Sequence, residues 1–411
     1  MTTKISILIT ILILVSTGCN HNMGTEPVPK DIVMTPKSLS LVSAGNSFTF
    51  SLLSKIPDSQ GHNVMVSPLS ISLALSMTLN GAAGSTRDSI IKTLGLTGLS
   101  VDEINQTYLD LIAALEAADS KVVMDIANSI WIKKSYPVLD SFITVNQKYY
   151  DAKVATLEFD QAALVTINNW VNANTNGKIP TILDQIPTND IMILVNAIYF
   201  NGKWKVQFVK SNTINGSFTP GSGSPVSVPL MKVKEQFGYS QQSGYEALKM
   251  PYGRGKFSMV LLLPAVGKAP DQLIGQLNPS VWAGLKTSLA IPQMVDVWLP
   301  RFTFNWESDL KDILSSLGMG VAFSITQANF SKINPNDELF ITKVKHKTYI
   351  QVDEEGTEAA AVTSVEIGPT MVNPNSIPVF HAIRPFLFFI TEEDTGAILF
   401  VGKVENPLLM N

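Results

Sequence analysis

The sequence predicts an α+β protein with large, mostly antiparallel β-sheets. Apolar residues with helical spacing dominate the first half of the chain, whereas runs of β-branched and aromatic residues dominate the second half. The 411 residues are 45% hydrophobic and 16% charged, which is enough apolar material for a large core. The run richest in Pro, Gly and Ser, at 219–225, lies between two strand-like segments and is typical of a surface turn. We therefore expect one domain over 39–411.

Six segments are expected to form helices, each with apolar residues at helical spacing. The second begins at Ser67, a good capping residue, followed by Pro68, which fits the first turn of a helix. The last two end near Gly177 and Gly318, because glycine commonly terminates helices. The expected helices are 43–56, 67–79, 101–118, 141–150, 163–175 and 307–317.

Seven segments are expected to form strands. They are short and rich in Val, Ile, Phe and Tyr, a composition that favours buried strands over helices. The expected strands are 122–132, 191–200, 257–263, 293–304, 339–353, 385–391 and 398–404.

The N-terminus has the pattern of an export signal over 1–18. Lys4 precedes an apolar stretch, 5–15, that is too short to cross a bilayer as a helix. Small residues follow, and then Cys19, the only cysteine, which excludes a disulfide within the chain. Ser-Thr-Gly before Cys19 resembles a bacterial lipobox. We therefore expect an exported lipoprotein at the cell surface or outer membrane, bound to the membrane only through lipid on Cys19; a plainly secreted protein is the alternative.

Residues 19–38 contain Gly and several prolines but few large apolar groups, and they are expected to form a flexible tether.

Composition and motifs disfavour several classes of function. The net charge is −4 and the basic residues are scattered, so a nucleic-acid partner is not expected. The chain has four histidines and no Gly-x-Ser-x-Gly motif, metal-ligand spacing or phosphate-binding glycine loop. We therefore expect neither an enzyme nor a metal or cofactor.

The segment 354–379 is too long for an ordinary connection inside a domain. In its first half, Thr357, Ala359 and Ala361 lie on one side of a period-two repeat, and Glu358 and Glu366 lie on the other. Its second half contains three prolines and cannot pair as a central strand. The segment therefore joins a potential strand to a coil, although an Ala-rich helix or a disordered loop is also compatible with it.

The segment Val352-Asp-Glu-Glu-Gly-Thr-Glu-Ala-Ala-Ala361 resembles the hinge of inhibitory serpins. Ile383 departs from the family, which usually has Asp or Asn there. Other motifs of the family occur before and after the hinge, in the family's order, over about 40–408. They are Asn63-Val-Met-Val-Ser-Pro68, Gly81-Ala-Ala-Gly84, Thr175-Asn-Gly-Lys-Ile179, Leu194-Val-Asn-Ala-Ile-Tyr-Phe200, Leu299-Pro-Arg-Phe302, Arg384-Pro-Phe386 and Phe400-Val-Gly-Lys403.

The resemblance implies the serpin fold, with about eight to nine helices around three β-sheets and an exposed reactive-centre loop at about 354–379. It also implies a monomer that traps a serine protease covalently as an acyl-enzyme. The implied hinge residues are Glu354, Gly356, Thr357, Glu358, Ala359, Ala360 and Ala361. Counting from the hinge as in the family gives Thr370–Met371 as the reactive bond, with Pro369–Thr370 and Met371–Val372 as alternatives.

The loop also indicates a class of target. No Lys or Arg occurs between Thr357 and Val379, so a trypsin-like protease, which needs a cation for its acidic pocket, is a poor target. We expect elastase-like or subtilisin-like serine proteases, and a papain-like cysteine protease remains an alternative target.

By resemblance, two groups of residues control opening of the main sheet. Glu354 is expected to pair with Arg301 beside Trp204. Ser67, Ser70, Asn196 and His346 are expected to form a polar cluster, the alternative being four separately satisfied groups. Rival hypotheses for the whole chain are a non-inhibitory serpin-fold binding protein, a hydrolase with an unrecognised Ser/His pair, and a surface adhesin.

Overall fold

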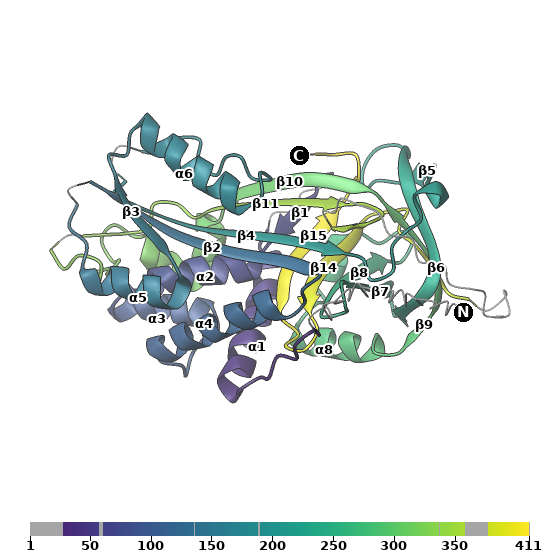
Figure 1. Ribbon diagram of the computed structural model, residues 1–411, viewed down its shortest axis with the longest axis horizontal. Coiled ribbons are helices and arrows are strands. Elements are labelled where there is room, and N and C mark those ends of the chain that lie inside the picture. The colour runs from purple at the N-terminus through teal and green to yellow at the C-terminus, as the bar shows by residue number, and fades with distance from the viewer. Residues whose placement is uncertain are drawn as a thin grey trace, which may run out of the picture.

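The computed structural model describes residues 28–56, 61–134, 136–187, 190–336, 338–357 and 377–410. Helices pack around two large β-sheets, as Figure 1 shows. Helices α2 and α4 contact one face of the six-stranded sheet, and α6 crosses the other face. No helix in these ranges is long and apolar enough to cross a membrane.

The described residues form nine α-helices, which agrees with the eight to nine implied by the family resemblance. Helices α3, α7 and α8 were not among the six expected from apolar spacing. Ser67 caps α2 as expected, because its side chain accepts a hydrogen bond from the N–H of Ser70 and Pro68 occupies the first turn. Helix α1 begins before the expected position, at Pro36 after the cap residue Thr35. The helices are α1 (Pro36–Leu53), α2 (Pro68–Leu79), α3 (Gly84–Thr93), α4 (Val101–Ala117), α5 (Asp140–Tyr150), α6 (Gln161–Asn174), α7 (Pro270–Ile274), α8 (Pro279–Ser288) and α9 (Lys311–Leu314).

The six-stranded sheet has the order β10-β11-β12-β4-β2-β3. The two-residue strand β12 is antiparallel to both of its neighbours, β11 and β4, which are therefore parallel to each other. The bounds are β2 (Val122–Lys133), β3 (Lys153–Leu157), β4 (Met192–Lys203), β10 (Phe302–Asp309), β11 (Lys345–Val352) and β12 (Gly356–Thr357).

The nine-stranded sheet has the order β1-β15-β14-β8-β7-β6-β9-β13, and β5 pairs with β6. The 17-residue β6 pairs with β5 at its start, with β9 along its middle and with β7 near its end. Two of the three expected sheets are therefore continuous through β6. The bounds are β1 (Val64–Val66), β5 (Ile214–Phe218), β6 (Val226–Gln242), β7 (Tyr245–Tyr252), β8 (Phe257–Pro264), β9 (Pro292–Pro300), β13 (Val379–His381), β14 (Phe386–Glu392) and β15 (Ile398–Val404).

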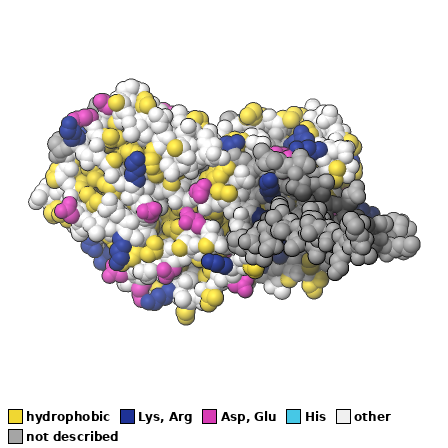
Figure 2. All heavy atoms as spheres, viewed as in Figure 1, with side chains coloured by type: hydrophobic (Ala, Val, Ile, Leu, Met, Phe, Trp, Pro, Cys, Tyr) yellow, Lys and Arg dark blue, Asp and Glu magenta, His cyan; other side chains and the backbone are white. Residues whose placement is uncertain are grey.

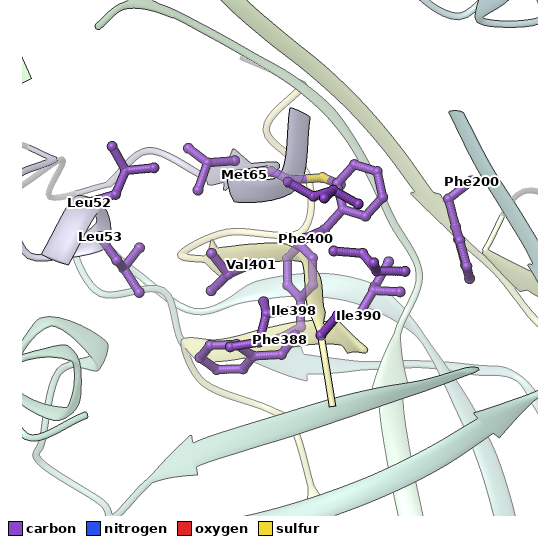
Figure 3. Close-up of a cluster of buried hydrophobic side chains, with 14 of the residues drawn as sticks. Leu52, Leu53, Met65, Phe200, Phe388, Ile390, Ile398, Phe400 and Val401 are labelled. Carbon is purple, nitrogen blue, oxygen red and sulfur yellow. The ribbon is translucent and has the colours of Figure 1, made fainter. Parts of the chain in front are cut away.

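The core lies where the two sheets meet α1 and α2. The rings of Phe200 on β4 and Phe400 on β15 are 6.3 Å apart and packed edge to face. Figure 3 shows them with Met65 and with Phe388 and Ile390 of β14, in a cluster of apolar side chains buried against α1. This shared core couples the six-stranded sheet to the rest of the molecule.

Three sequence expectations are wrong in their boundaries. The expected strand at 293–304 is two strands, because the chain crosses at Arg301 from β9 in one sheet to β10 in the other. The expected helix at 307–317 begins only at Lys311, since Glu307 extends β10 and forms ion pairs with two lysines of β11. The expected strand at 339–353 begins only at Lys345.

Candidate functional site

The site begins where the chain leaves β11 and turns back into the six-stranded sheet. Oδ1 of Asp353 accepts hydrogen bonds from the backbone N–H groups of Glu355 (2.9 Å) and Gly356 (3.3 Å), which closes a tight turn. The chain then forms β12, in which Thr357 lies between Val352 of β11 and Gly202 of β4. The hinge thus already occupies the first position of a strand between β11 and β4.

Gly356 has a geometric reason to be glycine. A Cβ atom at this position would lie 2.2 Å from the carbonyl oxygen of Gly202 and 2.7 Å from Cα of Lys203. Both are backbone atoms, so they cannot move aside as the end of a flexible side chain could. Any larger residue at position 356 would therefore have to displace β12 from β4.

Thr357 is buried and held by its side chain. Its Oγ1 lies 2.6 Å from the hydroxyl oxygen of Tyr252, which is fully buried on β7. Tyr252 stacks on the indole of Trp204, with ring centroids 4.5 Å apart. Burial raises the pKa of Tyr252 well above its ordinary value, so the hydroxyl remains a neutral hydrogen-bonding group.

Glu354 forms an ion pair with Arg301, the residue between β9 and β10. Arg301 Nε lies 2.8 Å and 2.9 Å from the two carboxylate oxygens, and Thr213 donates to Oε1 at 2.5 Å. The carboxylate is 2% exposed. Burial alone would raise the pKa of Glu354, but the hydrogen bonds from Arg301 and Thr213 outweigh it and hold the pKa below its ordinary value.

The backbone of the turn is bound to the segment after β4. The indole N–H of Trp204 donates to the carbonyl of Asp353 at 2.9 Å, and its backbone N–H donates to the carbonyl of Glu355 at 2.8 Å. The N–H of Phe208 donates to the carbonyl of Glu354. Trp204 is therefore in direct contact with the hinge, beside the Glu354–Arg301 pair as expected.

Beyond Thr357, a narrow slot separates β4 from β11. None of the described strand pairings joins these two strands directly. The slot contains a cavity of about 20 Å³, bounded by Ile198 on β4, Tyr349 on β11 and the segment after α6. Lys178 of that segment lies 5.2 Å from the ring centre of Tyr349. This volume is close to that of a single water, so an added strand requires β4 and β11 to separate.

The end of the slot away from β12 contains four polar residues: Ser67, Ser70, Asn196 and His346. His346 Nε2 accepts a hydrogen bond from the N–H of Ser67 at 3.1 Å, and Oγ of Ser67 accepts one from the N–H of Ser70 at 3.2 Å. Burial lowers the pKa of His346 to about 4, so the ring is neutral near pH 7 and can accept this bond.

Asn196 does not join the other three by any hydrogen bond in the described part of the chain. It donates instead to Oδ1 of Asn128 on β2 at 2.7 Å, and its own Oδ1 has no described partner. Asn128 in turn donates to the carbonyl of Tyr150 at 2.7 Å. The expected single cluster is therefore two groups, one linking β11 to α2 and one linking β4 to β2.

Several residues at this site were not identified from the sequence: Asp353, Thr213, Lys210, Tyr252 and Asn128. Lys210 forms an ion pair of 2.6 Å with the buried Glu355. Asp353 lies inside the hinge motif, but its role in closing the turn was not expected. The other four lie far from the hinge in the sequence, and no motif marks them. Other expected site residues lie outside the described part of the chain, namely Glu358, Ala359, Ala360, Ala361, Pro369, Thr370, Met371, Val372 and Cys19.

The fold and this site define a class of protein in which the segment after β11 begins an additional strand, β12, between β11 and β4 of the main sheet. Comparison with known proteins agrees with that class. A family model described as "Serpin (serine protease inhibitor)" matches residues 43–407. The chain therefore belongs to the serpin family, whose members are generally inhibitors of serine proteases and not enzymes.

Two relatives and one solved structure show how closely the chain follows the family. It is 36% identical to human neuroserpin over 86% of this chain and 88% of that protein. It is 32% identical to a serpin-like protein of Methanosarcina acetivorans, over 89% of this chain and 86% of that one. The native structure of the thermophilic serpin tengpin superposes with a TM-score of 0.83 at 31% identity, covering 92% of this chain and 96% of that chain.

Proposed function

We propose that this serpin is a single-use inhibitor that traps its target protease by inserting the reactive-centre loop between β4 and β11. The observation that carries the proposal is the position of Thr357, which is already paired to both flanking strands. Glu354, Gly356 and Thr357 occupy the start of the insertion path. A loop that served only as a surface epitope would not need this pairing, and a serpin-fold binding protein is distinguished by the cleavage test below.

The chemistry begins as an ordinary proteolytic attack. The serine Oγ of the protease attacks the carbonyl carbon of Thr370, the bond to the nitrogen of Met371 breaks, and the released amine takes a proton from the general acid of the protease. An ester between protease and loop remains. Pro369–Thr370 and Met371–Val372 are the alternative reactive bonds.

Insertion then competes with hydrolysis of that ester. An inserted strand of about ten residues gains ladder hydrogen bonds worth roughly 0.5–1.5 kcal/mol each. Their sum is comparable to the stability of a typical domain, about 5–15 kcal/mol. An attached protease can therefore be distorted before its active site completes deacylation.

The hinge composition suits this insertion. Thr357 faces the core, so the period-two alternation of a strand would direct Ala359 and Ala361 the same way after insertion. Glu358 and Ala360 would then face the opposite side of the sheet. Small uncharged residues at the buried positions avoid the cost of burying a charge or a large side chain.

The loop sequence favours elastase-like or subtilisin-like targets, since it has no Lys or Arg from Thr357 to Val379. A papain-like protease is the alternative, because it also forms an acyl-enzyme. The active form is proposed to be a monomer that needs no cofactor. We further propose export through the signal at 1–18 and attachment through lipid on Cys19, with residues 19–38 as the tether.

The test is to mix the protein with a pancreatic-type elastase and separate the products by denaturing electrophoresis. The trap predicts a band that survives boiling, at the summed mass minus the C-terminal peptide, and the sequence of that peptide identifies the bond. Thr357→Arg is the matched variant, since a buried charge at the insertion path should give cleavage without a complex. Cleavage by elastase, subtilisin and a papain-like protease without any stable complex would exclude inhibition.

A further inference from the structure

The outer edge of the six-stranded sheet is open along part of β2. Strand β2 pairs with β4 over its whole length, whereas β3 covers its other edge only from Ser129 to Lys133. No described strand lies beside residues 122–128 on that edge. The N–H of Ile126 points outward there, toward Oε1 of Glu116 at 3.4 Å. Because alternate residues of a strand direct their backbone groups to alternate edges, Met124 faces outward in the same way.

This edge forms the floor of a groove of about 830 Å³. One wall is the end of α4 with the following turn, including Glu116 and Ser120, and the other is the end of α6. Tyr199 and Asn201 of β4 line the groove beside β2 in the same sheet. Figure 1 shows β2 running between α4 and α6. At about 3.3 Å per residue, the edge at 122–127 is roughly 20 Å long, which matches an extended segment of about six residues. At its start, the N–H of Val122 donates to the carbonyl of Asp119 in the preceding turn.

The groove is acidic. Glu116, Asp119 and Asp125 line it, and none of its described lining residues is basic. Burial raises the pKa of Glu116, and the nearby negative charges of Asp125 and Asp151 also raise it. Figure 2 shows acidic side chains gathered over β2 between α4 and α6.

The open edge also carries an exposed apolar side chain, because Val123 is 48% exposed. An unpaired edge strand is a template for an added strand, and proteins usually protect such edges with lysine, proline or a bulge. Here the edge has aspartate and valine in place of those features. Backbone pairing, negative charge and an apolar contact are therefore available together.

We propose that this edge binds an extended, basic segment of a partner protein, which pairs with β2 as an added strand. Its Lys or Arg side chains would lie near Glu116 and Asp125, and its apolar side chains would contact Val123. The reactive-centre loop of a second copy has the wrong charge, since 358–376 contains two glutamates and no Lys or Arg. The site is separated from β12 by β4, so the partner can bind while the hinge slot remains closed.

Fluorescence anisotropy with the full-length folded protein tests the proposal without involving protease inhibition. The probe is a labelled hexapeptide of alternating Lys and Val. The controls are the same peptide with Glu in place of Lys, and the Lys peptide N-methylated at the amides that would pair with β2. The proposal predicts at least tenfold weaker binding for each control peptide, and weaker binding of the probe as salt rises.

Protein variants complete the test. The double variant Glu116→Gln/Asp125→Asn and the single variant Val123→Lys should each weaken probe binding at least tenfold. Val165→Lys is the matched control, since Val165 is also a half-exposed valine but lies in the first part of α6, outside the groove. Circular dichroism would check that all variants fold. Undiminished binding by the N-methylated peptide or by the double variant would overturn the proposal, as would no binding of the probe at low salt.

Discussion

The hydroxyl oxygen of Tyr252 lies 2.6 Å from Oγ1 of Thr357, and both side chains are buried. Tyr252 belongs to β7 of the nine-stranded sheet, whereas Thr357 forms β12 of the six-stranded sheet. The hydrogen bond therefore joins the two sheets at the point where the hinge enters. The stacked ring of Trp204 fixes the position of Tyr252, and its indole N–H binds the turn that precedes β12.

We expect Tyr252→Phe and Thr357→Val each to lower the free energy of unfolding by about 1 kcal/mol, since each removes one partner of a buried hydrogen bond. In a double-mutant cycle measured by urea denaturation, the coupling energy should also be about 1 kcal/mol. Tyr149→Phe is the control, because the hydroxyl of Tyr149 contacts only the exposed Lys148 among described residues. Strictly additive effects of Tyr252→Phe and Thr357→Val would show that the two hydroxyls do not interact.

The ion pair between Glu354 and Arg301 provides a second prediction. Arg301→Ala leaves a carboxylate that is 2% exposed without its cation, and we expect a loss of about 2 kcal/mol in the free energy of unfolding near neutral pH. Arg301→Ala/Glu354→Gln should recover most of that loss, because the unpaired charge is then absent. Urea denaturation of both variants measures this difference, and equal stability of the two would contradict the argument.

The same pair predicts a pH dependence. The folded pKa of Glu354 is lowered, so the stabilisation is complete above the unfolded pKa of about 4.3 and is lost as the pH falls through the lower folded pKa. The stability difference between the wild-type protein and Arg301→Ala should therefore shrink in acid. A difference that stays constant below about pH 4 would assign the effect to lost packing instead of lost charge.

Elements whose determinants are local were predicted well. The cap at Ser67 and the proline after it locate α2, and the strand expected at 398–404 is β15 with the same bounds. The helix expected at 307–317 failed for a non-local reason. Glu307 pairs with Lys345 and Lys347 on the neighbouring strand, and these contacts extend β10 through residues whose spacing favours a helix.

In the candidate site, too, some residues could be predicted from the sequence, whereas others depend on contacts between distant parts of the chain. The positions of Glu354, Arg301 and Trp204 were expected because the hinge resembles that of a known family. Tyr252 was not expected, since it is separated by 105 residues from its partner Thr357 and lies in β7, which was not among the expected strands. Asn196 was assigned to the wrong partners, because a strand sequence alone does not show that Asn128 of β2 lies opposite it.

His346 gives a fourth prediction. Its pKa is lowered by burial to about 4, so the unfolded chain binds a proton at higher pH than the folded protein. Stability should therefore fall as the pH drops from about 6.5 to about 4, by up to about 3 kcal/mol from this residue. His346→Gln keeps an acceptor for the N–H of Ser67 but cannot titrate, and it should flatten this part of the pH–stability curve. The exposed His62→Gln is the control, and an unchanged slope in His346→Gln would reject the assignment.

Gly356→Ala gives the last prediction, because it acts on the backbone and not on a side-chain bond. The added Cβ would lie 2.2 Å from the carbonyl oxygen of Gly202, so β12 must leave β4 or β4 must shift. We expect a loss of about 2 kcal/mol in stability, as for other overpacked sites. Amide exchange in β12 and in the facing residues of β4 should also become faster.

Gly284→Ala is the matched control for this change. Gly284 lies in α8 with no atom within 4 Å of an added Cβ, so alanine should leave the stability equal or slightly higher. Unchanged amide protection of Thr357 in Gly356→Ala would show that the hinge tolerates a side chain at this position. A different result is faster amide exchange in Gly356→Ala while the Glu354–Arg301 pair still contributes its full stabilisation. That result would show that the ion pair holds the turn independently, and that the close approach of Gly356 to Gly202 holds Thr357, the first residue of the inserting strand, in the sheet.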